Sequence, residues 1–170
     1  MGVDDMDNWQ KKEFLLMYNH AVKAEREVRE EYEQLQLDGI LLRSPSFDKD
    51  SGGGGATVKD LGDHLARLER LMDRDLLPKI RWRLDVHGLI TAAINELPKE
   101  NQRLVLRARY LLFVQTEYER KHGLGGTQLR TWRQVGDYCG YSRDSVLKIQ
   151  RAALRHIRVP AVIEEMLSHR

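Results

Sequence analysis

The sequence predicts an all-α protein, and two observations support this fold class. Charged residues make up 32% of the chain and aromatic residues only 7%, which favours helices with charged outer faces over a sheet protein. Apolar residues also recur at helical spacing on both sides of a glycine-rich segment. The 170 residues are enough for one domain, or for one domain with an extension.

The first predicted helix is long and amphipathic and covers Trp9 to Leu37. Its apolar stripe, which Glu25 interrupts, consists of Phe14, Tyr18, Ala21, Val28, Tyr32 and Leu35. Asp38-Gly39 is expected to end this helix. Residues 43–56 (RSPSFDKDSGGGGA) are predicted to be a flexible linker, with disorder at 51–55, because consecutive glycines lose much backbone entropy in a regular element.

A second helix is predicted to begin at Thr57, whose hydroxyl can cap its N-terminus. Its apolar stripe has the spacing of a helix that packs on another helix and consists of Leu61, Leu65, Leu68, Met72 and Leu76. Pro78 is expected to kink or restart the helix, and the apolar pattern then continues to Leu97 through Ile80, Leu84, Leu89, Ile90 and Ile94. Residues 1–96 therefore predict an antiparallel, coiled-coil-like helical hairpin.

Such a narrow hairpin shelters its apolar stripe only in part. It either docks on the rest of the chain or forms a homodimer through the N-terminal helices. The sequence does not choose between these alternatives, because a single apolar stripe does not set stoichiometry.

A third helix is predicted from about Pro98, which fits the first turn of a helix. Its apolar face is wide enough to need at least two neighbours. It includes Leu104, Val105, Leu106, Ala108, Leu111 and Leu112. The helical pattern continues through Phe113, Val114 and Tyr118, until the glycines at 123, 125 and 126 stop it and leave a polar connection to Arg130.

Thr131 to Ile157 predicts a helix-turn-helix. Thr131 and Ser142 can cap the two helices, and Gly140 can take the left-handed turn between them. The inner face of the first helix consists of Trp132, Val135 and Cys139, and that of the second of Val146, Ile149, Ala153 and Ile157. Long basic side chains occupy the opposite face of the second helix, as a helix that enters the major groove of DNA requires.

The outer face supplies candidates for two kinds of DNA contact. The residues predicted to read bases are Arg143, Asp144, Leu147, Lys148 and Arg151, since Arg and Lys donate to guanine, Asp accepts from cytosine and Leu touches the thymine methyl. The residues predicted to contact phosphate are Arg130, Arg133, Ser142, Arg155 and Arg158.

Charge is distributed in a way that agrees with this interpretation. Residues 1–95 carry 14 basic and 18 acidic side chains, whereas residues 96–170 carry 14 basic and 8 acidic ones. The net charges are therefore −4 and +6, which places the polyanion-binding part in the second half. We accordingly expect a hairpin domain at 1–96 and a DNA-binding domain at 97–170.

The C-terminal half resembles region 4 of bacterial primary sigma factors. Leu97 to Tyr110 (LPKENQRLVLRARY) is similar to the first half of that region, and Thr131 to Ile157 is similar to its promoter-reading helix-turn-helix. The resemblance implies base contacts by Arg143, Asp144 and Lys148. Lys148 stands where sigma factors usually have Gln, and the connection at 112–130 is longer than theirs. Nothing before Leu97 resembles the other sigma regions, so a complete sigma factor is not expected.

The order of a helical N-terminal segment, a glycine-rich linker, a second helix and a sigma-like helix-turn-helix is similar to the ArpU and RinA-like regulators of prophage late genes. This resemblance implies a DNA-binding activator of phage late transcription. Two alternatives remain open. One is the small terminase subunit of a DNA-packaging machine, which would form a large ring. The other is an adaptor whose sigma-like domain contacts RNA polymerase.

Other classes of function find no support in the sequence. No histidine pairs with carboxylates at metal-ligand spacing, and no nucleophile or phosphate-loop motif is present, so we expect no enzyme, no metal and no cofactor. No apolar run approaches the length of a membrane span, and the mean hydropathy is −0.56. The single cysteine and the acidic N-terminus predict a protein of the reducing cytoplasm.

Overall fold

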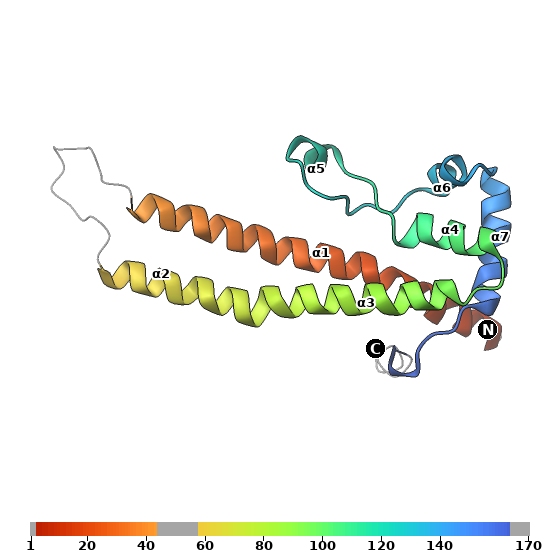
Figure 1. The fold of residues 1–170 in the computed structure, drawn as a ribbon, viewed down its shortest axis with the longest axis horizontal. Helices are drawn as coiled ribbons and strands as arrows, with labels where there is room; N and C mark the ends of the chain where they lie inside the picture. Colours follow the sequence, from red (N-terminus) through yellow and green to blue (C-terminus); the bar gives the residue numbers. More distant parts are fainter. Residues whose placement is uncertain (1–2, 44–57, 164–170) are drawn as a thin grey trace. The chain divides into compact units, whose positions relative to one another are not determined.

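A computed structural model describes residues 3–43 and 58–163 and confirms the all-α fold (Figure 1). Its helices are α1 (Val3–Arg43), α2 (Val58–Leu71), the π-helical turn η1 (Met72–Leu76), α3 (Leu77–Asn95), α4 (Glu100–Tyr110), α5 (Glu117–Lys121), α6 (Trp132–Cys139) and α7 (Arg143–His156). The expected cap at Thr57 and, apart from Arg43, the expected linker lie outside the described residues. No described helix is both long and apolar enough to cross a membrane.

The chain divides into two compact units. Unit 1 consists of residues 1–23 and 83–170, and unit 2 consists of residues 24–82. Because the division cuts α1 and α3, each of these helices contributes to both units. The helix-turn-helix therefore belongs to the same unit as the start of α1 and the end of α3.

In unit 2, the second part of α1 lies beside α2, as the hairpin prediction requires (Figure 1). Helix α1 does not end at Asp38-Gly39 as expected but continues to Arg43. The reason is packing, since a Cβ at Gly39 would lie 2.5 Å from Nε2 of His64 on α2. Gly39 thus permits a close approach of two helices rather than a helix end.

A π-helical turn precedes Pro78, where the sequence predicts a kink or restart. The Leu77 N–H donates to the Met72 carbonyl, five residues back, instead of four. Proline has no N–H for the carbonyl four residues before it, and its ring clashes there, so a widened turn accommodates it. The helix restarts as α3 without a break.

Helices α4, α6 and α7 pack against one another in unit 1. Their shared core consists of Val105, Ala108, Val135 and Val146, with Trp132, Cys139 and Ile149 packed around it. Two neighbours thus cover Val105, Leu106 and Ala108 of the wide apolar face, as predicted, whereas Leu104 and Leu112 of the same predicted face are exposed. The helix begins at Glu100 rather than at Pro98, because Lys99 has the extended backbone of an N-cap residue. Leu84, placed on the apolar stripe by the sequence, is 55% exposed.

The prediction that the third helix continues through Tyr118 is wrong. Helix α4 ends at Tyr110, and Leu111 follows as its C-cap. The backbones of Val114 and Gln128 then pair with each other, the Val114 N–H donating to the Gln128 carbonyl at 2.8 Å. Residues 113–128 are therefore a folded excursion, which we call the α5 lobe, rather than a helix followed by a loose connection.

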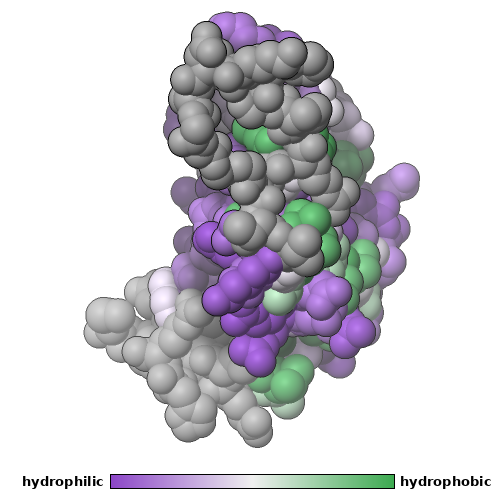
Figure 2. Space-filling model, turned by 90° about the vertical axis from the view of Figure 1, so that its left-hand side faces the viewer, coloured by the Kyte–Doolittle hydropathy of each residue, from purple (hydrophilic) through white to green (hydrophobic). Residues whose placement is uncertain are grey.

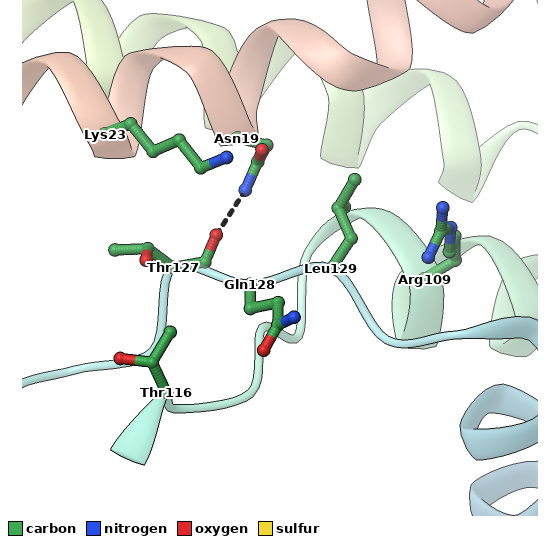
Figure 3. Close-up of a pocket in the computed structure, with 7 residues that line it drawn as sticks. All are labelled: Asn19, Lys23, Arg109, Thr116, Thr127, Gln128 and Leu129. Atoms are coloured by element: carbon green, nitrogen blue, oxygen red, sulfur yellow. Dashed lines mark hydrogen bonds between the residues drawn. The ribbon is translucent and has the colours of Figure 1, made fainter. Parts of the chain in front are cut away.

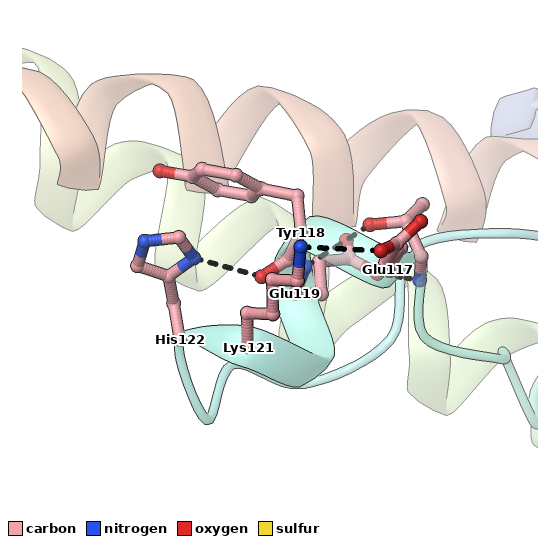
Figure 4. A network of polar contacts seen from close by, with 6 residues as sticks. Glu117, Tyr118, Glu119, Lys121 and His122 are labelled. Atoms are coloured by element: carbon pink, nitrogen blue, oxygen red, sulfur yellow. Dashed lines mark hydrogen bonds and ion pairs between the residues drawn. The ribbon is translucent and has the colours of Figure 1, made fainter.

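Helix α5 begins with a capping box (Figure 4). The Thr116 hydroxyl accepts from the Glu119 N–H at 3.2 Å, and the Glu119 carboxylate accepts from the Thr116 N–H at 2.7 Å. The same carboxylate is buried and accepts from the Thr127 N–H and hydroxyl across the lobe. Glu119 thus joins the two ends of the lobe.

The α5 lobe packs on the start of α1 within unit 1. Buried Asn19 donates from Nδ2 to the Thr127 carbonyl at 2.6 Å. The Tyr18 ring stacks on Phe113 with 5.3 Å between centroids. Only glycine fits at position 126, because a Cβ there would lie 2.6 Å from the Val114 carbonyl carbon. These contacts hold the segment that leads into α6.

Candidate nucleic-acid interface

Helix α6 begins with the predicted cap. The Thr131 hydroxyl accepts from the Gln134 N–H at 3.2 Å, and the Gln134 side chain accepts from the Thr131 N–H at 2.8 Å. This reciprocal capping box satisfies two donors that the helix itself leaves free. It fixes where α6 begins relative to the α5 lobe.

The turn between α6 and α7 has the conformation expected of a helix-turn-helix. Gly140 ends α6 with φ 75°, in the left-handed region that favours glycine. Gly136 is equally necessary, because a Cβ there would lie 2.6 Å from the Tyr141 carbonyl oxygen. Gly136 does not stand out in the sequence, because its constraint comes from the Tyr141 backbone beyond the turn and not from its own helix.

Helix α7 buries the predicted inner face. Ser142 caps it, its hydroxyl accepting from the Ser145 N–H at 3.2 Å. Val146, Ala153 and Ile157 are buried and Ile149 is half-buried. Gln150 and Leu154 are also buried. On a helical wheel they lie about 40° and about 80° from Val146, so the periodicity places Gln150 on the inner face and Leu154 at its edge.

The predicted outer face of α7 carries its charged side chains into solvent. Four of the five predicted base-reading residues are exposed and Leu147 is half-buried beside them. Across residues 3–43 and 58–163, the basic residues of this face form no ion pair. They are Arg143, Lys148, Arg151 and Arg155; Arg158, which is also exposed and forms no ion pair within these ranges, follows the end of the helix. Their charge is therefore available to a polyanion.

The residues predicted to contact phosphate divide into two groups. Arg133, Arg155 and Arg158 are exposed, and Ser142 is exposed although its hydroxyl caps α7. Arg130 is different, because its guanidinium donates to the Ala108 carbonyl at 3.3 Å and to the Leu112 carbonyl. Arg130 thus satisfies carbonyl groups at the C-terminal end of α4, a structural contact that the sequence did not indicate.

Two arginines join α4 to α6 by stacking on aromatic rings. The Arg109 Cζ lies 4.8 Å from the Trp132 ring centroid, and the Arg130 Cζ lies 4.8 Å from that of Tyr138. Arg109 also donates to the Arg130 carbonyl. We call these four residues the arginine clasp. It holds the start of the helix-turn-helix on α4.

Burial shifts the pKa of three groups around the clasp. Desolvation lowers the pKa of the Arg109 guanidinium and raises that of the neighbouring Tyr110 hydroxyl. Desolvation also raises the pKa of the Cys139 thiol, although the charge of Arg130 opposes the shift. The thiol is therefore a packing group of α6 and a weak nucleophile.

In the part of the chain that the structure describes, no group of three or more His, Cys, Asp or Glu side chains is placed to hold a metal ion. Comparison with known proteins gave no matching family model, no similar curated protein and no similar solved structure. The chemistry of α6, the turn and α7 is therefore the basis for a functional assignment.

Proposed function

We propose that this protein is a sequence-specific regulator of transcription that binds double-stranded DNA. The observation that carries the proposal is the partition of α7, which buries its apolar face on α4 and α6 and exposes a basic face that forms no ion pair with the described residues. A helix of this kind, presented beside a short capped helix, has the form that enters the major groove. The resemblance to phage late-gene regulators suggests an activator of (pro)phage late genes acting in the cytoplasm.

Rigidity of the helix-turn-helix supports sequence reading over simple charge attraction. Both helices have side-chain caps, Gly140 and Gly136 fit the turn, and the arginine clasp fixes α6 on α4. Side chains that read base edges need such a fixed support, because bidentate hydrogen bonds tolerate little displacement.

A homodimer would recognise an operator with two-fold symmetry. Unit 2 offers a surface through which two copies of the chain could associate. Leu37, Ile40 and Leu41 of α1 are 55%, 60% and 71% exposed, and Leu65 of α2 is 43% exposed. The face drawn in Figure 2 shows separate green apolar areas among purple hydrophilic ones. Activation of transcription would in addition require that the DNA-bound protein contact host RNA polymerase.

The experiment that tests the proposal is selection of bound sequences from a random duplex pool at about 0.15 M salt, where electrostatic attraction alone gives only about 10⁻⁴ to 10⁻⁶ M affinity. We expect an enriched motif. A dimer predicts two half-sites separated by about 10 base pairs or a multiple. Salt-sensitive binding without any enrichment would overturn sequence-specific regulation and favour DNA packaging.

A further inference from the structure

Unit 1 contains a polar cavity that the helix-turn-helix does not use. Its volume is about 430 Å³, within the range of small-molecule sites. It lies between residues 19–23 of α1, the C-terminal part of α4 and the α5 lobe (Figure 3). The lining residues that matter for its chemistry are Asn19, Lys23, Arg109, Thr116, Thr127 and Gln128.

No carboxylate belongs to the described lining of this cavity, although the Thr116 N–H and the Thr127 N–H and hydroxyl already donate to the buried Glu119 carboxylate. The donors that remain for a ligand include those of Lys23, Arg109 and Gln128. Lys23 and Arg109 each contribute a positive charge, and Figure 3 shows them toward opposite ends of the cavity. Lys23 forms no ion pair within residues 3–43 and 58–163. The Arg109 Nε is buried and has no hydrogen-bond partner among the described residues.

A buried Arg109 Nε without an acceptor is costly, whereas Lys23 is exposed and remains solvated. A buried donor that loses water and gains no acceptor costs roughly 1–3 kcal/mol, more for a charged group. Desolvation accordingly lowers the pKa of Arg109. An oxyanion in the cavity would supply the missing acceptor and oppose this desolvation, because guanidinium groups bind carboxylate and phosphate with short, strong hydrogen bonds.

We propose that this cavity binds a small effector molecule that carries oxyanion groups at two positions, held by Lys23 and Arg109. Phosphate and carboxylate share this chemistry, and the lining hydroxyl and amide groups of Thr116 and Gln128 can bind the part of the ligand between them. The volume and the placement of the cavity among three elements favour a free small molecule over the continuous backbone of DNA.

The site reaches the DNA-binding helices through Arg109. The same guanidinium that lines the cavity donates to the Arg130 carbonyl and stacks on Trp132, the first residue of α6. An oxyanion that draws the guanidinium into the cavity weakens these contacts of the arginine clasp. Occupancy should therefore lower the affinity of the helix-turn-helix for DNA. This part of the inference rests on the proposed function, whereas anion binding does not.

The first experiment measures anion binding alone by calorimetric titration of the full chain with inorganic pyrophosphate and, separately, with succinate. We expect saturable binding of at least one probe, which also identifies phosphate or carboxylate as the preferred group. Lys23→Met should weaken that binding at least tenfold. Lys12→Met is the matched control, since Lys12 is an exposed lysine of α1 outside the cavity, and should leave binding unchanged.

Absence of saturable binding by either probe at millimolar concentration would overturn the site. An equal loss in both lysine variants would do the same, because it would show attraction to general surface charge. Circular dichroism of the two variants excludes a folding defect as the cause of lost binding.

The second experiment measures DNA affinity with and without a saturating concentration of the bound probe. We expect at least a fivefold loss of affinity in the natural chain, the lower limit of common allosteric couplings, and no such loss in Lys23→Met at the same ionic strength. Unchanged DNA affinity would overturn the coupling. A weaker DNA affinity of Lys23→Met without any probe would instead assign Lys23 to the DNA backbone and overturn the effector site. Anion binding by a chain that binds no DNA would leave the site standing and reject the proposed function.

Discussion

Gln150 of α7 donates a hydrogen bond from Nε2 to the hydroxyl of Tyr110, the last residue of α4, at a distance of 3.1 Å. Both side chains are buried. Lys148 and Arg151, which flank Gln150 along α7, are exposed. The bond therefore fixes the rotation of α7 and with it the face that the helix presents to DNA.

Tyr110→Phe should destabilise the protein by about 1–3 kcal/mol, because it leaves the buried Gln150 amide without its acceptor. Gln150→Leu should also be destabilising. The double variant should lose less than the sum of the two single losses, since both polar partners are then removed. Urea unfolding of the four proteins gives the comparison. Additivity within about 0.5 kcal/mol would show that the two groups are not coupled.

Gly136→Ala should destabilise the helix-turn-helix by about 1–3 kcal/mol, because the new methyl group would overlap the Tyr141 carbonyl. Gly88→Ala is the matched control, since Gly88 is a helical glycine with no atom within 4 Å of its Cβ position. It should stabilise the protein by about 0.5–1 kcal/mol. Thermal unfolding measures both changes. The same sign for the two substitutions would contradict the close packing at the turn.

Arg143→Ala and Lys148→Ala should each reduce affinity for the preferred duplex by about 1–3 kcal/mol and relax specificity at one position. Arg155→Ala should instead weaken binding to all sequences alike and lower the salt dependence, because it removes a phosphate contact. Fluorescence anisotropy with the selected duplex and a scrambled one separates the two effects.

Arg67→Ala serves as the control for these variants, because Arg67 is an exposed arginine of α2 in unit 2. It should leave both affinities unchanged. Equal losses in all four variants on both duplexes would reject the division into base-reading and phosphate-binding residues.

Alkylation of Cys139 should require a higher pH than that of an unhindered thiol. Burial raises the pKa of its thiol, so the reactive thiolate forms only above the ordinary range and reaction at pH 8 is slow in the folded protein. The folded state favours the protonated thiol, so the contribution of this group to stability is fully present below the ordinary pKa of a thiol and is lost as pH rises from that value through the raised pKa of the folded state.

The measurement is the rate of reaction with iodoacetamide as a function of pH, in buffer and in denaturing urea. Unfolding should shift the profile to lower pH and accelerate the reaction at pH 8. Identical profiles in the two conditions would contradict the burial of Cys139 against the core of α4, α6 and α7.

Local chemistry explains why the helix-turn-helix could be predicted from its residues. The caps at Thr131 and Ser142 act within three residues, and the left-handed turn at Gly140 depends on that glycine alone. Helical periodicity then gave the buried and exposed faces of α7, apart from Gln150 and Leu154, which were not assigned. The prediction of an all-α fold succeeded for the same reason, since helix formation depends mainly on neighbours along the chain.

The continuation of the third helix was predicted wrongly because its end depends on distant residues. Arg130 donates hydrogen bonds to the carbonyls of Ala108 and Leu112, and the backbone of Gln128 pairs with that of Val114. These partners lie 14 to 22 residues apart in the sequence, and helical periodicity cannot reveal contacts over that separation. Phe113, Val114 and Tyr118 have helical spacing, so the pattern predicted a continuous helix. Gly39 is a similar case, because its neighbour His64 lies on another helix.

The sequence by itself determined the helical class, the capped helix-turn-helix and the basic outer face, all of which follow from interactions within a few residues. Only the tertiary structure decided the roles of the arginines in the clasp. Arg109 and Arg130 look like Arg155 in the sequence, yet they are tied to carbonyls and aromatic rings while Arg155 remains exposed. A charged side chain forms intramolecular contacts or stays exposed according to which groups the fold brings within hydrogen-bond distance of it. These groups come from other elements, so packing between elements decides the outcome and the neighbouring sequence does not.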